Sequence, residues 1–303
     1  PKLPKKRNWK YKNKTNILKK KLLVFGHSGN FGSNFIYFLK DKYKFILNTN
    51  NSKLFFPDVH YIKFNKEEFL NNSQNLLKKI KEISPDIILN AAACVNLDLC
   101  EKKPNETALV NIILPSKLAE ICSDLKIKFV HISTDHLYNK TKPFKNENYL
   151  TSKVNNYGFQ KIKAENFVIK KNSNALIIRT NFFSHSSTSN QLIYKIMNVI
   201  KDKKKIKLFD DYFFTPIYSK YLCKIINFLI KKNHKGIFNV VSDEKISKYD
   251  FGKLFIKENI IAENYLIKSK IKNANLNTKR CSDLSLSNRK LKKILTFKIP
   301  TIK

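Results

Sequence analysis

Residues 22–32 read LLVFGHSGNFG, an apolar run that leads directly into three of the chain's six glycines. The apolar run predicts a buried strand, and residues 33–40 continue as an amphipathic helix. A glycine turn between such elements lets a pyrophosphate approach the backbone and rest on the positive N-terminal end of the helix. The GxxGxxG spacing therefore predicts a nucleotide cradle. Its residues are Gly26, Ser28, Gly29, Asn30, Phe31 and Gly32.

Further apolar runs alternate with helical segments as far as residue 180. They predict strands at 45–47, 85–90, 129–134 and 176–179, and a helix over 107–125. This alternation is typical of an α/β fold of the Rossmann type, with a doubly wound parallel sheet. We expect three regions: a mobile basic arm over 1–20, an NAD(P)-binding domain over 21–180, and residues 181–303 as a smaller α/β substrate-binding region with parts returning to the core.

Two segments bear on the choice of cofactor. Residues 48–53 read NTNNSK and lack the carboxylate that holds the ribose 2′-hydroxyl in NAD binders. We therefore expect NADP(H) to be favoured over NAD(H), with Asn50 and Asn51 near the ribose. The run Ala91, Ala92 and Ala93 follows a predicted strand, where small side chains let a flat cofactor lie against the backbone.

Composition sets limits on the function. The net charge is +36, but only four of the 59 basic residues are arginine, the residue expected for reading bases or phosphates. We therefore predict no specific nucleic-acid partner. No run approaches the roughly 20 apolar residues of a membrane span. Five cysteines without CxxC pairing indicate reduced thiols in a cytoplasmic protein, and no metal-ligand spacing is present, so we predict no metal.

A second motif carries the predicted chemistry. Residues 156–161 read NYGFQK, which places Tyr157 and Lys161 four residues apart on one helical face. A lysine ammonium stabilises a phenolate, so the tyrosine can donate a proton to a carbonyl oxygen while hydride reaches the carbon. A hydroxyl of Ser133 or Thr134, at the end of a predicted strand, would share the charge on that oxygen.

These motifs together resemble the extended short-chain dehydrogenase/reductases, in the branch of the dTDP-4-dehydrorhamnose reductases. The likeness spans residues 21–298. It rests on NAAA at 90–93 with Asp98, Glu101 and Pro104, on HISTD at 131–135, on NYGFQK at 156–161, on 209–217, on 236–240, and on the C-terminal segment around Arg280.

The resemblance implies reduction of a 4-keto group on a nucleoside-diphosphate deoxysugar, for precursors of surface polysaccharides. It implies Thr134, Tyr157 and Lys161 as catalytic residues, and it adds Asn111, Tyr157 and Lys161 to the cofactor contacts. The implied substrate contacts are Asn96, Asp98, Asp135, His136, Arg179 and Arg280. The sequence departs from the pattern of this branch at His27, at 94–96, at His136 and at 181–184, which leaves a different sugar nucleotide open.

Other functions stay open at this point. The regulatory subunit of methionine adenosyltransferase also resembles this branch and would bind NADP without turnover. A sugar-nucleotide epimerase or dehydratase of the same superfamily would use the same tyrosine and lysine. The oligomeric state is open as well, with a homodimer as one option.

Overall fold

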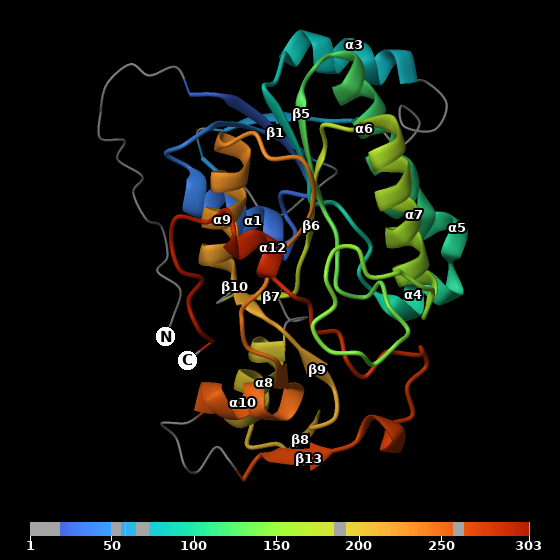
Figure 1. Ribbon diagram of the computed structural model, residues 1–303, viewed down its shortest axis with the longest axis vertical. Helices are drawn as coiled ribbons and strands as arrows, with labels where there is room; N and C mark the ends of the chain where they lie inside the picture. Colours follow the sequence, from blue (N-terminus) through green and yellow to red (C-terminus); the bar gives the residue numbers. More distant parts are fainter. Residues whose placement is uncertain are drawn as a thin grey trace.

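A seven-stranded parallel sheet is the centre of the computed structural model, which describes residues 19–49, 56–57, 59–64, 73–184, 192–256 and 264–302 (Figure 1). Its strands, in spatial order, are β11 (Gly236–Asn239), β6 (Leu176–Arg179), β5 (Lys128–Ile132), β4 (Ile87–Asn90), β1 (Lys21–Phe25), β2 (Lys44–Asn48) and β3 (His60–Ile62). Each neighbouring pair is parallel. The order reverses between β1 and β4, where doubly wound sheets bind their ligands. The predicted Rossmann-type fold is confirmed.

Helices cover both faces of this sheet. One face packs against α1 (Asn30–Leu39), α9 (Ser219–Lys231) and α12 (Arg289–Lys292). The other packs against α3 (Ser73–Ile83), α6 (Leu114–Asp124) and α7 (Asn156–Lys171). Alternate residues of β1 serve the two layers: Leu22 and Val24 face the first, and Leu23 and Phe25 the second.

The connection from β4 to β5 is more broken than the sequence predicts. The structure has α4 (Leu97–Lys102), α5 (Pro104–Ala108), a π-helical turn (Leu109–Ile113) and then α6, in place of one helix over 107–125. The π turn carries Asn111, whose side chain accepts from the backbone N–H of Cys94 (2.8 Å) and donates to its carbonyl (3.0 Å). A local widening of a helix at such a residue is typical of functional sites.

A smaller lobe lies below the sheet in Figure 1. It contains α8 (Leu192–Lys201), α10 (Lys248–Ile256) and the 3₁₀ turn Ile271–Asn273. Its strand pairs are β8 (Ile206–Phe209) with β13 (Leu266–Ser269), β9 (Phe213–Phe214) with β12 (Ile246–Ser247), and β7 (Phe182–Phe183) with β10 (Ile217–Tyr218). The chain leaves this lobe to form α9, β11 and α12 on the large sheet.

Some predictions concern residues that the structure does not describe. Asn50, Asn51 and residues 1–18 of the predicted basic arm lie outside the described ranges. The predicted domain boundary at residue 180 stays a prediction. Among the described helices, none combines the length and apolar character needed to cross a bilayer.

Candidate active site

The glycine turn after β1 is packed too closely to accept side chains at two of its three glycines. Gly26 has a φ of +84°, and a Cβ there would lie 2.5 Å from the backbone nitrogen of Ala92. A Cβ on Gly32 would lie 2.2 Å from the Gly26 carbonyl oxygen. At Gly29 the same atom would be 3.3 Å away, so that position is less strict. The turn thus brings bare backbone and the N-terminus of α1 to the switch point, the arrangement that fits a dinucleotide pyrophosphate.

The remaining predicted cradle residues surround this turn. Ser28 is exposed, Phe31 is buried, and the side-chain oxygen of Asn30 accepts a hydrogen bond from the Ser184 hydroxyl (2.8 Å). His27 is buried, and its Nδ1 lies 2.8 Å from the Asn48 carbonyl oxygen at the end of β2. Since a carbonyl only accepts, Nδ1 of His27 carries the proton.

The alanine run forms the next part of the sheet edge. Ala91 continues from β4 and donates its N–H to the Phe25 carbonyl (2.9 Å). The N–H of Ala92 donates to the side-chain oxygen of Asn90 (3.2 Å). Ala91, Ala92 and Ala93 are each half-buried, and their methyl side chains leave the backbone accessible at this edge of the sheet, beside the glycine turn. These predicted cofactor contacts therefore lie side by side, whereas Asn111 holds the loop at Cys94 and donates to Gln160 (2.8 Å).

Tyr157 and Lys161 project from α7 toward the end of β5. The side chain of Asn155 caps this helix by accepting from the Gly158 N–H (2.8 Å). Burial raises the pKa of the Tyr157 phenol, while a hydrogen bond with the Thr134 hydroxyl acts in the opposite direction. The structure thus brings together a protonated phenol and Thr134, one of the two hydroxyls that the sequence leaves open, whereas Ser133 donates to Glu165 (2.5 Å).

The side chain of Lys161 is held by two residues of β5. Its Nζ donates to the Ile132 carbonyl (2.8 Å) and lies 3.1 Å from Nε2 of His131. Burial lowers the pKa of Lys161 to about 8, with Glu165 acting in the opposite direction. Burial, and then Lys161, lower the pKa of His131 well below its usual value, so this ring is neutral.

A charged cluster borders the tyrosine on the side of the small lobe. The ring of His136 packs edge-on against that of Tyr157, with centroids 5.9 Å apart. Asp135 accepts from the Asn181 amide (2.5 Å) and lies 3.8 Å from the His136 ring nitrogen. Arg280 acts electrostatically on His136, and its Nε is buried without a hydrogen-bond partner in the described part of the chain.

Lys248 belongs to the same cluster, and sequence reasoning missed it. It begins α10, and its Nζ lies 3.3 Å from the centroid of the Phe214 ring. Burial lowers its pKa to about 8, Asp135 raises it, and Arg280 lowers it further. One carboxylate, Asp135, thus faces two cations, Lys248 and Arg280, and this excess of positive charge suits an anionic ligand. One lysine in a lysine-rich chain gave no signal that could single it out.

Three predicted substrate residues have other partners in the structure. Arg179 is buried and donates to both carboxylate oxygens of Glu165, with Nη2 to Oε2 at 2.6 Å. Asn96 caps α4 by accepting from the Leu99 N–H (3.1 Å). Asp98, also on α4, accepts a hydrogen bond from the Thr278 hydroxyl. Their contact with substrate stays a prediction, and Arg179 lies apart from the cluster around Asp135.

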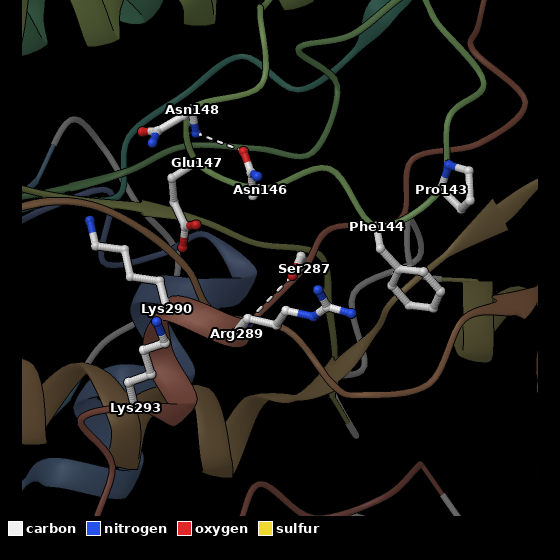
Figure 2. A pocket seen from close by; sticks show the side chains of 9 residues that line it. All are labelled: Pro143, Phe144, Asn146, Glu147, Asn148, Ser287, Arg289, Lys290 and Lys293. Carbon is white, nitrogen blue, oxygen red and sulfur yellow. Dashed lines mark hydrogen bonds between the residues drawn. The ribbon is translucent and has the colours of Figure 1, made fainter.

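A separate surface pocket of about 580 Å³ holds none of the predicted site residues. It lies between the loop at 143–148 and α12, and Figure 2 shows Lys290 and Lys293 on one side of it and Phe144 on the other. The glycine turn and the predicted catalytic pair of Tyr157 and Lys161 lie instead at the carboxyl edge of the sheet.

Known proteins resemble this chain in sequence and in fold. A family model described as RmlD substrate binding domain matches residues 20–303. The chain is 27% identical over 188 residues to the probable low-salt glycan biosynthesis reductase of Haloferax volcanii; the match covers 60% of this chain and 63% of that protein, less than two thirds of its length.

Two solved structures extend the likeness over nearly the whole chain. A hypothetical dTDP-4-dehydrorhamnose reductase from Sulfolobus tokodaii matches with a TM-score of 0.80 and 25% identity, covering 93% of this chain and 97% of the other. The dTDP-4-dehydrorhamnose reductase of Bacillus anthracis, in complex with NADP, matches with a TM-score of 0.77 and 20% identity, covering 94% and 96%. The second likeness shows the fold alone.

Proposed function

Because the chain belongs to the RmlD substrate binding domain family, we propose that it is a nicotinamide-dependent reductase of the 4-keto group on a nucleoside-diphosphate deoxysugar. One observation carries the proposal: Tyr157, Thr134 and Lys161 meet at the same sheet edge as the glycine turn. The relatives named as a glycan biosynthesis reductase and as dTDP-4-dehydrorhamnose reductases support this reaction and a role in polysaccharide precursor synthesis.

The residues at the edge fit the cofactor. Side chains at Gly26 and Gly32 would collide with neighbouring backbone, so these glycines fix the tight turn and its packing, and the exposed Gly29 leaves backbone open to a pyrophosphate. When bound, the reduced nicotinamide supplies the hydride. We propose NADP(H) over NAD(H) because residues 48–53 contain no carboxylate for a ribose 2′-hydroxyl.

In the proposed reaction, Tyr157 donates its phenol proton to the substrate carbonyl oxygen as that carbon receives hydride. Burial raises the pKa of Tyr157, which keeps the phenol protonated in the cofactor-free protein, so the proposed transfer depends on groups that stabilise the tyrosinate. The Thr134 hydroxyl donates to the same oxygen and shares its developing charge. Lys161 stabilises the tyrosinate that remains. The cluster of Asp135, His136, Lys248 and Arg280, whose charges act on one another, is the proposed contact for the sugar nucleotide.

The test is oxidation of NADPH, and separately of NADH, with dTDP-4-keto-6-deoxy-L-lyxo-hexose, followed by nicotinamide absorbance. Tyr157→Phe should lower turnover by about 10²–10⁴-fold while leaving cofactor affinity nearly unchanged, because one acid catalyst is lost. Tyr37→Phe, at an exposed tyrosine on α1, is the matched control and should keep full activity.

Two results would contradict the proposal. Full activity of Tyr157→Phe would exclude this phenol as the proton donor. Cofactor binding without oxidation, for this and other nucleoside-diphosphate keto sugars, would favour a regulatory subunit, whereas isomerised or dehydrated sugar with recycled cofactor would favour an epimerase or dehydratase.

A further inference from the structure

The catalytic lysine is the last member of a buried chain of hydrogen bonds that begins beside the glycine turn. The chain runs from the Ala92 N–H to Asn90 (3.2 Å), from Asn90 to Nδ1 of His131 (3.2 Å), and from Nε2 of His131 to Lys161 (3.1 Å). Asn90, His131 and Lys161 are each at most 1% exposed, so water does not compete for these contacts.

The direction of each bond follows from its neighbours. A backbone N–H only donates, so the Asn90 atom that faces Ala92 is the carbonyl oxygen Oδ1. The Asn90 amide nitrogen therefore faces His131 and donates to Nδ1. Because a neutral imidazole carries one proton, that proton lies on Nε2 of His131, the nitrogen that faces Lys161.

We propose that His131 is a positioning residue: it donates its Nε2 proton to Lys161 Nζ and favours the uncharged amine form of the catalytic lysine in the cofactor-free protein. If Nζ of Lys161 were an ammonium, one of its N–H groups would face the Nε2–H of His131, and two donors cannot bond to each other. An uncharged amine accepts from Nε2–H and still donates to the Ile132 carbonyl. The inference rests on the proposed function only for the catalytic role of Lys161.

Two other influences act on the protonation of Lys161, namely its burial and a neighbouring carboxylate. Tyr157 and Glu165 lie one helical turn on either side of it on α7. Glu165 raises the pKa of Lys161, so it favours the ammonium. Burial and the His131 N–H both disfavour the ammonium form of Lys161. The series of hydrogen bonds begins at the Ala92 N–H. A cofactor bound against the alanine run would therefore contact the residue from which the bonds to Lys161 start.

The first measurement is the tautomer of His131 in the cofactor-free protein, from ring ¹⁵N shifts and long-range couplings in ¹⁵N–¹H NMR. Nε2–H is expected for His131. His27 is the matched control in the same spectrum, because its Nδ1 faces a carbonyl and must be Nδ1–H. His131→Leu and His27→Gln assign the signals, and Nδ1–H at His131 would overturn the proposal.

The second measurement is the titration of the Lys161 side chain by ¹³C NMR, assigned with Lys161→Arg. His131→Leu should raise the midpoint by about 0.5–1 pH unit, the effect of one net hydrogen bond. Lys128 is the internal control: burial lowers its pKa to about 8 too, but its bonds go to the Asn174 and His234 carbonyls, so its midpoint should not move.

An unchanged or lower midpoint for Lys161, or an equal shift at Lys128, would overturn the inference. If His131→Leu does not fold, the tautomer in the wild-type protein decides. Neither measurement uses turnover, so loss of the reductase proposal in the NADPH assay and loss of this inference are separate outcomes.

Discussion

Replacing Arg179 by methionine separates a structural role of this residue from the substrate contact predicted for it. The Arg179 and Glu165 side chains are 4% and 3% exposed, and Nη2 to Oε2 is 2.6 Å. Nη1 of Arg179 also donates to the Tyr138 hydroxyl (2.8 Å) and the Glu147 carbonyl (3.1 Å). Burial opposes the guanidinium charge, but Glu165 and Tyr138 raise the pKa of Arg179 overall.

The magnitude follows from what the substitution leaves behind. Arg179→Met keeps the Glu165 carboxylate in the interior with the Ser133 hydroxyl (2.5 Å) as its remaining described donor. Removing one partner of a buried pair costs about 3–5 kcal/mol. The double variant Arg179→Met with Glu165→Leu removes both charges and should recover about 2 kcal/mol or more of that loss.

Equilibrium urea unfolding of the cofactor-free protein measures these free energies. Lys171→Met is the control, since its pair with Glu120 is 39% and 46% exposed and should be worth less than about 1 kcal/mol. A loss below about 1 kcal/mol for Arg179→Met, with a raised KM for the sugar nucleotide, would refute the structural role and restore the substrate contact. Additive losses in the double variant would also refute it.

The other predictions concern the glycine turn, the buried lysine and the cap of α7. Gly32→Ala should weaken NADPH binding more than tenfold in a fluorescence titration, because its Cβ would lie 2.2 Å from a carbonyl oxygen of the turn. Gly236→Ala is the control for backbone strain: Gly236 also has a φ of +84°, but it begins β11, away from the turn, so binding should be normal. Unchanged affinity in Gly32→Ala would contradict the cradle. The pKa of Lys161 falls from 10.5 unfolded to about 8 folded, so the unfolded state binds more protons between them. The free energy of unfolding should therefore rise by about 1 kcal/mol from pH 7 to 8.5 on account of this group, and Lys161→Met should flatten that rise. Asn155→Ala should cost about 1–2 kcal/mol in urea unfolding by removing the acceptor of the Gly158 N–H, and a wild-type value would exclude the cap.

Five strands of the large sheet, β1, β2, β4, β5 and β6, could be predicted because their signals are local. The apolar run before Gly26 and the alternation of strands and helices to residue 180 specify a βαβ fold without any distant contact. The break at Leu109–Ile113 could not be predicted, since it accompanies side-chain bonds from Asn111 to Cys94 and Gln160. The two-residue strands of the small lobe, such as β9 and β12, are too short to show a period.

The site divides in the same way. Tyr157 and Lys161 were found from their spacing on one helix, but the partners of Lys161 come from β5 and could not be read from α7 alone. Glu165 was missed although it carries a usable signal: it lies four residues after Lys161 on the same helical face. A carboxylate at that place, opposite the arginine that ends β6, indicates an internal partner for Arg179.

The spacing on α7 explains how one rigid helix serves both the fold and the chemistry. Glu165 fastens the helix to β6 through Arg179, Lys161 fastens it to β5 through the Ile132 carbonyl, and Tyr157 stands at the end toward the small lobe. A shift of the helix along its axis that moved the phenol would also break the charged contact, so the buried pair protects the position of the proposed proton donor. Stability and turnover are therefore coupled here: variants at Glu165 should lower kcat as well as the free energy of unfolding, although Glu165 contacts neither the substrate carbonyl nor the phenol in the proposed reaction.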